Sequence, residues 1–223
     1  MVKSKTRYVC SNCGSAQPKW MGKCPDCDEW NTLVETIVQE AAPGRPAGAA
    51  IAAGGVGPQS LPDIPADGYE RIPVSISELS RVLGGGIVPG SVVLISGDPG
   101  IGKTTLLSQL CNELAKPGLT RAGDGPVLYV SGEESAAQIK MRAGRLGIAS
   151  PDIQVLAETH LETISNYIQQ LHPRMVVVDS VQSIYSDAIQ SGAGSVTQVR
   201  DCSAHLLRLA KADGFPLFLV GHV

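Results

Sequence analysis

This 223-residue sequence has no long apolar runs, few aromatic residues and a small net charge. No stretch of about 18 apolar residues occurs, and the first residues include charged and polar ones, so neither a membrane-spanning helix nor a secretory signal is expected. We therefore expect a cytoplasmic protein with no membrane partner. Because the net charge is −3, any nucleic acid would have to bind to local patches of the surface.

Glycine and proline, by contrast, are abundant, and many of them gather in one segment. The sequence holds 25 Gly and 15 Pro, and residues 41–59 consist mostly of Ala, Gly and Pro. Such a composition cannot bury a core and is typical of a flexible linker. We predict a small N-terminal unit at 1–35, a linker at 36–63 and a larger domain at 64–223.

Four of the six cysteines form two CxxC pairs in the N-terminal unit, Cys10 with Cys13 and Cys24 with Cys27. Each pair presents two thiolates on a tight turn, and two such pairs can close a tetrahedron around Zn²⁺. About 30 residues bury too little apolar surface to fold unaided, so the metal would supply the folding energy. Two disulfides or a thioredoxin-like redox pair are disfavoured by the cytoplasmic setting and by the lack of a strand-to-helix junction. We predict a zinc ribbon with four cysteine ligands.

The loop between the two cysteine pairs carries Lys19, Trp20 and Lys23, and Trp30 follows the second pair. A basic and aromatic tip can stack on a base of single-stranded DNA, or it can bind a protein. The alternative is that the tryptophans form the small core of the finger. We expect this of Trp30, whereas both roles stay open for Trp20.

Apolar runs alternate with helical patterns throughout the larger domain. The apolar runs predict five strands, at 92–96, 127–130, 153–156, 175–178 and 217–220. The intervening periodicity predicts four helices, at 104–115, 135–146, 161–171 and 196–212. This alternation implies a doubly wound α/β fold with a parallel sheet, whose ligands bind at the carboxyl ends of the strands. Cys111 and Cys202 fall within the helices and are expected to be buried apolar residues.

A phosphate-binding loop follows the first strand of this domain. The segment reads GDPGIGKT and matches GxxxxGK[ST] between a strand and a helix. Its backbone N–H groups would hold the phosphates of ATP, Lys103 would reach the β and γ oxygens, and Thr104 would coordinate Mg²⁺. The residues expected to bind the nucleotide are Gly97, Asp98, Pro99, Gly100, Ile101, Gly102, Lys103, Thr104 and Thr105.

Acidic residues at the ends of two other strands complete the predicted site. Asp179 ends the run MVVVD and is expected to hold Mg²⁺ through water. Ser180 follows it, which argues against the AAA+ arrangement, where the activating glutamate comes directly after that aspartate. Glu133 ends the strand after the P-loop helix, so we expect it to be the general base that polarises the attacking water. Glu134 is the alternative, or else the first acidic residue of the next helix.

His222 follows the last apolar run and is the remaining candidate residue of the predicted site. A polar side chain at this edge can sense the γ-phosphate by a hydrogen bond that differs between the ATP and ADP states. The alternative is a solvated strand terminus.

The finger and the P-loop region together closely resemble the RadA (Sms) family of bacterial DNA-repair ATPases. The resemblance rests on YVCSNCGSAQPKWMGKCPDCDEWNTLVE, ISELSRVLGGGIVPGSVVLISGDPGIGKTT, SGEES and VVVDSVQS. It covers all but the linker, and it is specific because KaiC-like ATPases resemble the ATPase domain alone and lack such a finger. It implies a RecA-like core in which Lys103, Thr104, Asp179 and Glu133 keep the roles given above, and it favours the sensor role of His222.

The resemblance also implies what the protein acts on. Members of the family form hexameric rings, bind single-stranded and branched DNA, work with the recombinase RecA and drive branch migration in homologous recombination. Candidate DNA contacts here are Lys140, Arg142 and Arg145, although a solvated helix face explains them equally well. Residues 180–195 form a candidate mobile loop that couples the nucleotide state to DNA. The alternative function is a nucleotide-regulated protein-binding switch of the KaiC-like kind, without translocation.

Members of the family continue beyond the strand that ends this sequence. They complete the ATPase core and add a KNRFG motif and a domain that resembles the Lon protease. We therefore expect an incomplete, C-terminally truncated core. Because ring ATPases complete each site with a basic residue from a neighbouring subunit, we expect this chain to bind nucleotide, to hydrolyse it poorly and to form no stable hexamers.

Overall fold

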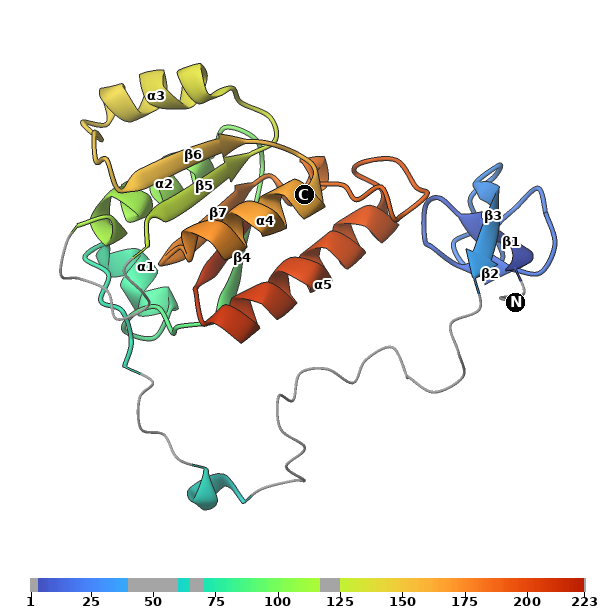
Figure 1. The fold of residues 1–223 in the computed structure, drawn as a ribbon, viewed down its shortest axis with the longest axis horizontal. Coiled ribbons are helices and arrows are strands. Elements are labelled where there is room, and N and C mark those ends of the chain that lie inside the picture. The colour runs from blue at the N-terminus through green and yellow to red at the C-terminus, as the bar shows by residue number, and fades with distance from the viewer. Residues whose placement is uncertain (1–3, 40–59, 65–69, 117–124, 223) are drawn as a thin grey trace. The chain divides into compact units, whose positions relative to one another are not determined.

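The computed structural model describes residues 4–39, 60–64, 70–116 and 125–222. The chain divides between residues 68 and 69 into two compact units, each with its own β-sheet (Figure 1). Among the described helices, none is long and apolar enough to cross a bilayer.

A three-stranded antiparallel sheet organises the N-terminal unit. Its strands, in the order β2-β1-β3, are β1 (Ser4–Cys10), β2 (Ala16–Gln17) and β3 (Leu33–Gln39). Residues 36–39, predicted as linker, belong to this sheet, because each of them pairs with a residue of β1. Of the remaining predicted linker, 40–59 lie outside the described residues, and Leu61–Asp63 form a 3-10 turn, η1.

Five parallel strands form the sheet of the larger unit. They are β4 (Val92–Ser96), β5 (Val127–Ser131), β6 (Ile153–Ala157), β7 (Met175–Asp179) and β8 (Leu217–Gly221). The order is β4-β8-β7-β5-β6, and every neighbouring pair is parallel. The prediction of a doubly wound parallel sheet is confirmed, and each strand lies within one residue of its predicted bounds.

The helices of the larger unit start and stop at local sequence signals. They are α1 (Ser77–Val82), α2 (Lys103–Leu114), α3 (Ala136–Arg145), α4 (Leu161–Leu171) and α5 (Val196–Asp213). Ser135 caps α3 in a capping box with Gln138. Ser195 caps α5, which ends at Gly214 in the left-handed conformation with φ of 77°. Only α1 has no counterpart among the predicted helices.

Two apolar cores cover the opposite faces of the sheet. In Figure 1, α4 and α5 lie in front of the sheet and α2 lies behind it. Successive side chains of β7 point to opposite faces of the sheet. Val177 packs with α2, whereas Val176 and Val178 pack with α4 and α5. Cys111 and Cys202 are buried, as predicted, and burial raises their pKa values to about 12 and about 11. Neither thiol is therefore reactive at neutral pH.

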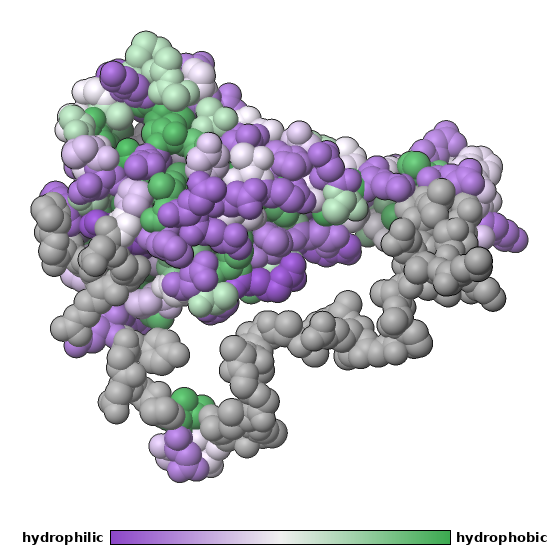
Figure 2. Space-filling view, in the orientation of Figure 1, coloured by the Kyte–Doolittle hydropathy of each residue, from purple (hydrophilic) through white to green (hydrophobic). Residues whose placement is uncertain are grey.

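The outer helix α3 packs less completely than α2. It buries Ile139 alone, whereas α2 buries seven residues. Figure 2 shows hydrophilic residues over α4 and α5 and hydrophobic residues gathered beside α3. A cavity of about 590 Å³ lies there, lined by Ile139, Ile148 and Ile153 among others. The most completely buried part of the fold is thus the central sheet with α2, and it is this part that positions the P-loop.

Candidate nucleotide site and metal centre

The four N-terminal cysteines converge into one cluster. Their sulfur atoms all lie within 4.8 Å of one another, and all four are free. Cys10 Sγ lies 3.6 Å from Cys27 Sγ, and Cys13 Sγ lies 3.6 Å from Cys24 Sγ. A tetrahedron with Zn–S bonds of about 2.3 Å has S–S edges of about 3.8 Å, whereas a disulfide bond is about 2 Å long. The cluster therefore fits a tetrahedral metal ion and not two disulfides.

Two tryptophans flank Gly22 on the surface of this unit. Trp20 is 54% exposed and Trp30 is 68% exposed, and ring atoms of both lie within 4 Å of the position that a Cβ at Gly22 would take. The expectation that Trp30 belongs to the core of the finger is wrong. That core is formed by the cysteines and Leu33, and Tyr8 supplies the aromatic ring that packs against it.

The predicted P-loop runs between β4 and α2. Gly100 and Gly102 have φ values of 82° and 101°. Glycine adopts these positive φ angles without strain because it has no Cβ, whereas other residues rarely adopt them. Lys103 is buried, and its Nζ donates hydrogen bonds to the carbonyl oxygens of Gly97 at 2.5 Å and Asp98 at 2.9 Å. The ammonium group is therefore held inside the loop by backbone oxygens.

Asp179 is linked to the first turn of α2 and to β5. Thr104 Oγ1 donates to Asp179 Oδ2 at 2.9 Å, and the Tyr129 hydroxyl donates to the same oxygen at 2.6 Å. Burial, together with the neighbouring Asp179 carboxylate, raises the pKa of Tyr129 far above its usual range, so the hydroxyl keeps its proton. Sequence reasoning missed Tyr129, because a tyrosine inside a buried strand carries no signal of the side chain it will contact.

Glu133 and His222 meet at the same edge of the sheet. Ser180 Oγ donates to Glu133 Oε1 at 2.5 Å, and His222 Nε2 lies 3.3 Å from that oxygen. The turn that carries Glu133 approaches η2 (Val181–Ser183) closely because Gly132 has no side chain. A Cβ at Gly132 would collide with Ser183. The Glu133 carboxylate remains 52% exposed and open to the cavity.

Glu134 and Arg142 form an ion pair beside this edge. Because Ser135 caps α3, Glu134 precedes the helix instead of forming its first turn. The Arg142 side chain is only 12% exposed, so its alternative place on a solvated helix face is wrong. It turns inward because Glu134 neutralises it there. Lys140 and Arg145 are exposed and stay candidates for DNA contacts.

A cavity of about 330 Å³ collects these groups. Its lining consists of Pro99, Gly100, Gly102, Lys103, Thr104, Thr105, Ser131, Glu133, Glu134, Arg142, Asp179 and His222. The structure thus brings together one buried lysine, a threonine–aspartate pair, a solvent-accessible glutamate and a histidine. Of the other predicted nucleotide-binding residues, Gly97 and Asp98 hold Lys103, and Ile101 is exposed.

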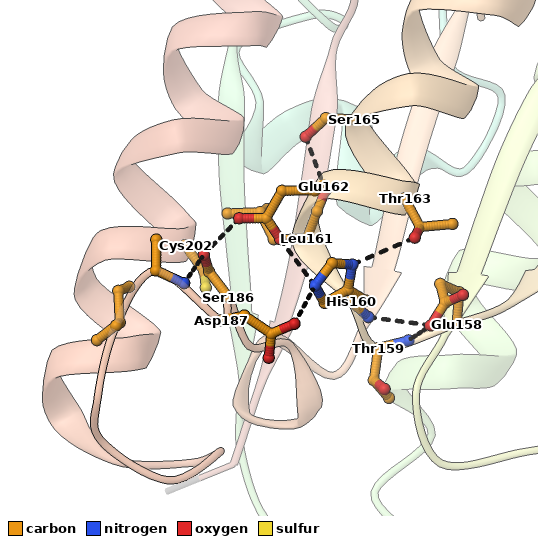
Figure 3. Close-up of polar contacts among 12 residues, drawn as sticks. Glu158, Thr159, His160, Leu161, Glu162, Thr163, Ser165, Ser186, Asp187 and Cys202 are labelled. Carbon is orange, nitrogen blue, oxygen red and sulfur yellow. Dashed lines mark hydrogen bonds and ion pairs between the residues drawn. The ribbon is translucent and has the colours of Figure 1, made fainter.

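The loop after Asp179 is tied down at its middle (Figure 3). His160 Nε2 lies 3.0 Å from Asp187 Oδ2, and His160 Nδ1 lies 3.2 Å from Thr163 Oγ1. The side-chain amide of buried Gln198 accepts a hydrogen bond from Ser186 N at 3.0 Å and donates to carbonyl groups of residues 186, 189 and 191. Any movement of the predicted mobile loop 180–195 would have to break these contacts or carry α4 and α5 with it.

Comparison with known proteins finds a family match in each of the two units. The AAA domain family matches residues 58–223, and the rubredoxin metal binding domain family matches residues 8–35. The DNA repair proteins RadA of Bacillus subtilis and Pseudomonas aeruginosa are 47% and 46% identical to the chain, over 100% of it and 48% of each relative. The chain therefore spans about half the length of these curated relatives.

A solved structure shares the fold of the larger unit. The KaiC-like protein from the hyperthermophilic archaeon Pyrococcus horikoshii superposes with a TM-score of 0.54 at 19% identity, covering 70% of this chain and 73% of that one. At this level of identity the likeness concerns the fold alone. It agrees with the RecA-like sheet expected from the sequence.

Proposed function

Since the chain belongs to the AAA domain family and aligns along its whole length with the N-terminal half of RadA proteins, we propose that it is the magnesium-dependent ATP-hydrolysing part of a DNA repair ATPase. The observation that carries this proposal is the convergence of Lys103, the Thr104–Asp179 pair and Glu133 on one cavity. A lysine and a hydroxyl at a helix N-terminus suit phosphate and Mg²⁺, and a nearby carboxylate suits an attacking water.

The residues of the P-loop bind and orient the triphosphate. Lys103 exchanges its carbonyl partners, Gly97 and Asp98, for β- and γ-phosphate oxygens, which are stronger acceptors because they are charged. Thr104 would coordinate Mg²⁺ and Asp179 would hold it through water, and the charge of the ion would neutralise that of the phosphates. The hydrogen bond between Thr104 and Asp179 keeps their oxygens 2.9 Å apart, a separation that suits two groups that act on one ion.

Glu133 is the proposed general base. Its carboxylate is half exposed at the mouth of the cavity, so a water molecule can reach it and lose a proton to it as it attacks the γ-phosphate. Ser180 fixes the orientation of the carboxylate. His222, on the same oxygen, is the proposed γ-phosphate sensor, since movement of Glu133 changes its hydrogen bond.

For the finger we propose Zn²⁺ as the metal of the four-cysteine site, because four thiolates in a tetrahedron are the ligand set that Zn²⁺ prefers. Exposed Trp20 and Trp30 provide ring faces for stacking on bases of single-stranded DNA. They equally suit a protein partner, so the two roles of the finger are separated by experiment.

At the level of the whole protein, we propose a ring-forming motor that moves on single-stranded and branched DNA, works with the recombinase RecA and promotes branch migration. Its support is the similarity to proteins named for DNA repair. The second candidate is a nucleotide-regulated protein-binding switch, whose support is that the exposed Trp20 and Trp30 equally suit a protein partner.

Steady-state ATP hydrolysis with and without single-stranded DNA distinguishes the motor from the switch. A motor must couple turnover to DNA, so we expect the low basal rate of this chain to rise about tenfold or more on adding DNA. The Lys103→Ala variant should show no turnover above background in either condition. A rate that depends on Lys103 but is unchanged by DNA would contradict the motor and favour the switch.

A further inference from the structure

Arg142 borders the phosphate cavity and has no role in the mechanism above. It projects from α3, and its side chain is 12% exposed. A long cationic side chain is rarely buried to this extent unless its partners compensate for the lost hydration. Its guanidinium carbon lies 5.9 Å from the centre of the Tyr129 ring. Within the part of the chain that the structure describes, its Nε is buried without a hydrogen-bond partner.

One arm of the guanidinium reaches Asp179 through Tyr129. Arg142 Nη2 lies 3.4 Å from the Tyr129 hydroxyl oxygen. A phenol has one proton, so an oxygen that faces Arg142 with its lone pair directs that proton elsewhere. The proton goes to Asp179 Oδ2, 2.6 Å away, beside the hydrogen bond from Thr104. Arg142 thereby fixes the direction of the Tyr129 hydroxyl, and the hydroxyl fixes the plane of the Asp179 carboxylate.

The other arm holds Glu134. Arg142 Nη1 forms an ion pair with Glu134 Oε2, whereas the adjacent Glu133 is bonded to Ser180 and His222. Two neighbouring carboxylates at a phosphate site would repel the nucleotide and compete for the same water. The ion pair compensates the negative charge of Glu134 and leaves Glu133 as the available base.

We propose that Arg142 is a positioning residue of the magnesium nucleotide site, which orients Asp179 through Tyr129 and holds Glu134 away from the phosphates. The proposal rests on the proposed function. It requires Arg142 to act on the metal side of the site, because its contacts lead to Asp179 and not to the P-loop. Lys103 and the loop remain responsible for the phosphates themselves.

Magnesium-dependent binding of a fluorescent ATP analogue, mant-ATP, tests this role without measuring hydrolysis. Arg142→Gln should raise the Mg²⁺ concentration for half-maximal binding about tenfold, as expected when the hydrogen-bonded group that orients a metal-holding carboxylate loses its own support. Binding in excess EDTA should weaken much less, because there only the unpaired Glu134 carboxylate repels the phosphates. Arg145→Gln, an exposed arginine one turn further along α3, is the matched control and should behave as wild type.

Tyr129→Phe should give a rise similar to that of Arg142→Gln, and the double variant should show no further rise, because the two side chains act in series. Arg142→Lys keeps the charge but lacks the fork that contacts Glu134 and Tyr129 together, so an intermediate shift is expected. If Arg142→Gln fails to fold, as judged by circular dichroism, Tyr129→Phe carries the test.

Three results would overturn the inference. The first is an unchanged Mg²⁺ requirement in folded Arg142→Gln or in Tyr129→Phe. The second is equal weakening of binding in EDTA, which would place Arg142 on the phosphates directly. The third is the same shift in Arg145→Gln, which would reduce the effect to general charge. If wild type itself binds no mant-ATP at any Mg²⁺ concentration, the proposed function fails, and this inference fails with it.

Discussion

Replacement of Glu133 by glutamine should lower the rate of ATP hydrolysis by about 10²- to 10⁴-fold and change the affinity for MgATP by no more than a few-fold. The amide keeps the size and the hydrogen bond from Ser180, but it cannot take a proton from the attacking water. Single-turnover release of phosphate from γ-labelled ATP measures the chemical step, and fluorescence titration with mant-ATP measures binding on the same preparation.

Glu134→Gln provides the contrast, because it changes the adjacent carboxylate by the same single atom. This side chain is paired with Arg142, so the variant should lose far less hydrolysis than Glu133→Gln does. A larger loss in Glu134→Gln than in Glu133→Gln would transfer the role of base to Glu134. Loss of MgATP binding in Glu133→Gln would instead make Glu133 a nucleotide ligand.

Removal of the metal from the four-cysteine cluster should unfold the N-terminal unit and leave the larger unit folded. Structural Zn²⁺ contributes about 10–16 kcal/mol in small zinc domains, and the buried core here consists of two of the cysteines and Leu33. The sequence has two tryptophans, Trp20 and Trp30, and both belong to this unit. Tryptophan fluorescence therefore reports on the finger alone, and mant-ATP binding reports on the larger unit.

Chelation should change the tryptophan emission, because the two exposed rings lose their packing around Gly22, and adding back ZnCl₂ should reverse the change. Purified protein should contain one zinc per chain, falling to none in Cys24→Ser and staying at one in Cys202→Ala, whose cysteine lies in α5. An emission spectrum that responds to reductant and not to chelator would contradict the metal site and favour disulfides.

The strands and the P-loop could be predicted because their signals are local. The run at Met175 is apolar up to its final aspartate, since β7 lies in the middle of a sheet that is covered on both faces. The P-loop requires positive φ angles, which residues other than glycine rarely adopt, so its glycines are visible in the sequence. Asp179 and Glu133 could be placed at one edge because parallel strands bring their carboxyl ends together.

The remaining features depend on contacts between distant segments, which spacing along the chain does not encode. The sequence predicts residues 36–39 as linker, whereas in the structure they pair with β1. The sequence predicts Trp30 as part of the core of the finger, whereas in the structure Tyr8 packs against that core and Trp30 is exposed. Arg142 looks like a solvated base on α3, and only the fold brings Glu134 and Tyr129 beside it. In each case a tertiary partner overrides the local pattern.

Calorimetric titration of the protein with ATP in the presence of Mg²⁺ tests the central claim, that the cavity between the P-loop, Glu133 and Asp179 is a nucleotide site. Wild type should bind one ATP per chain. Lys103→Ala, which removes the buried ammonium group and its charged hydrogen bonds, should bind about 10- to 100-fold more weakly. Absence of binding to wild type, or the same affinity in Lys103→Ala, would contradict the claim.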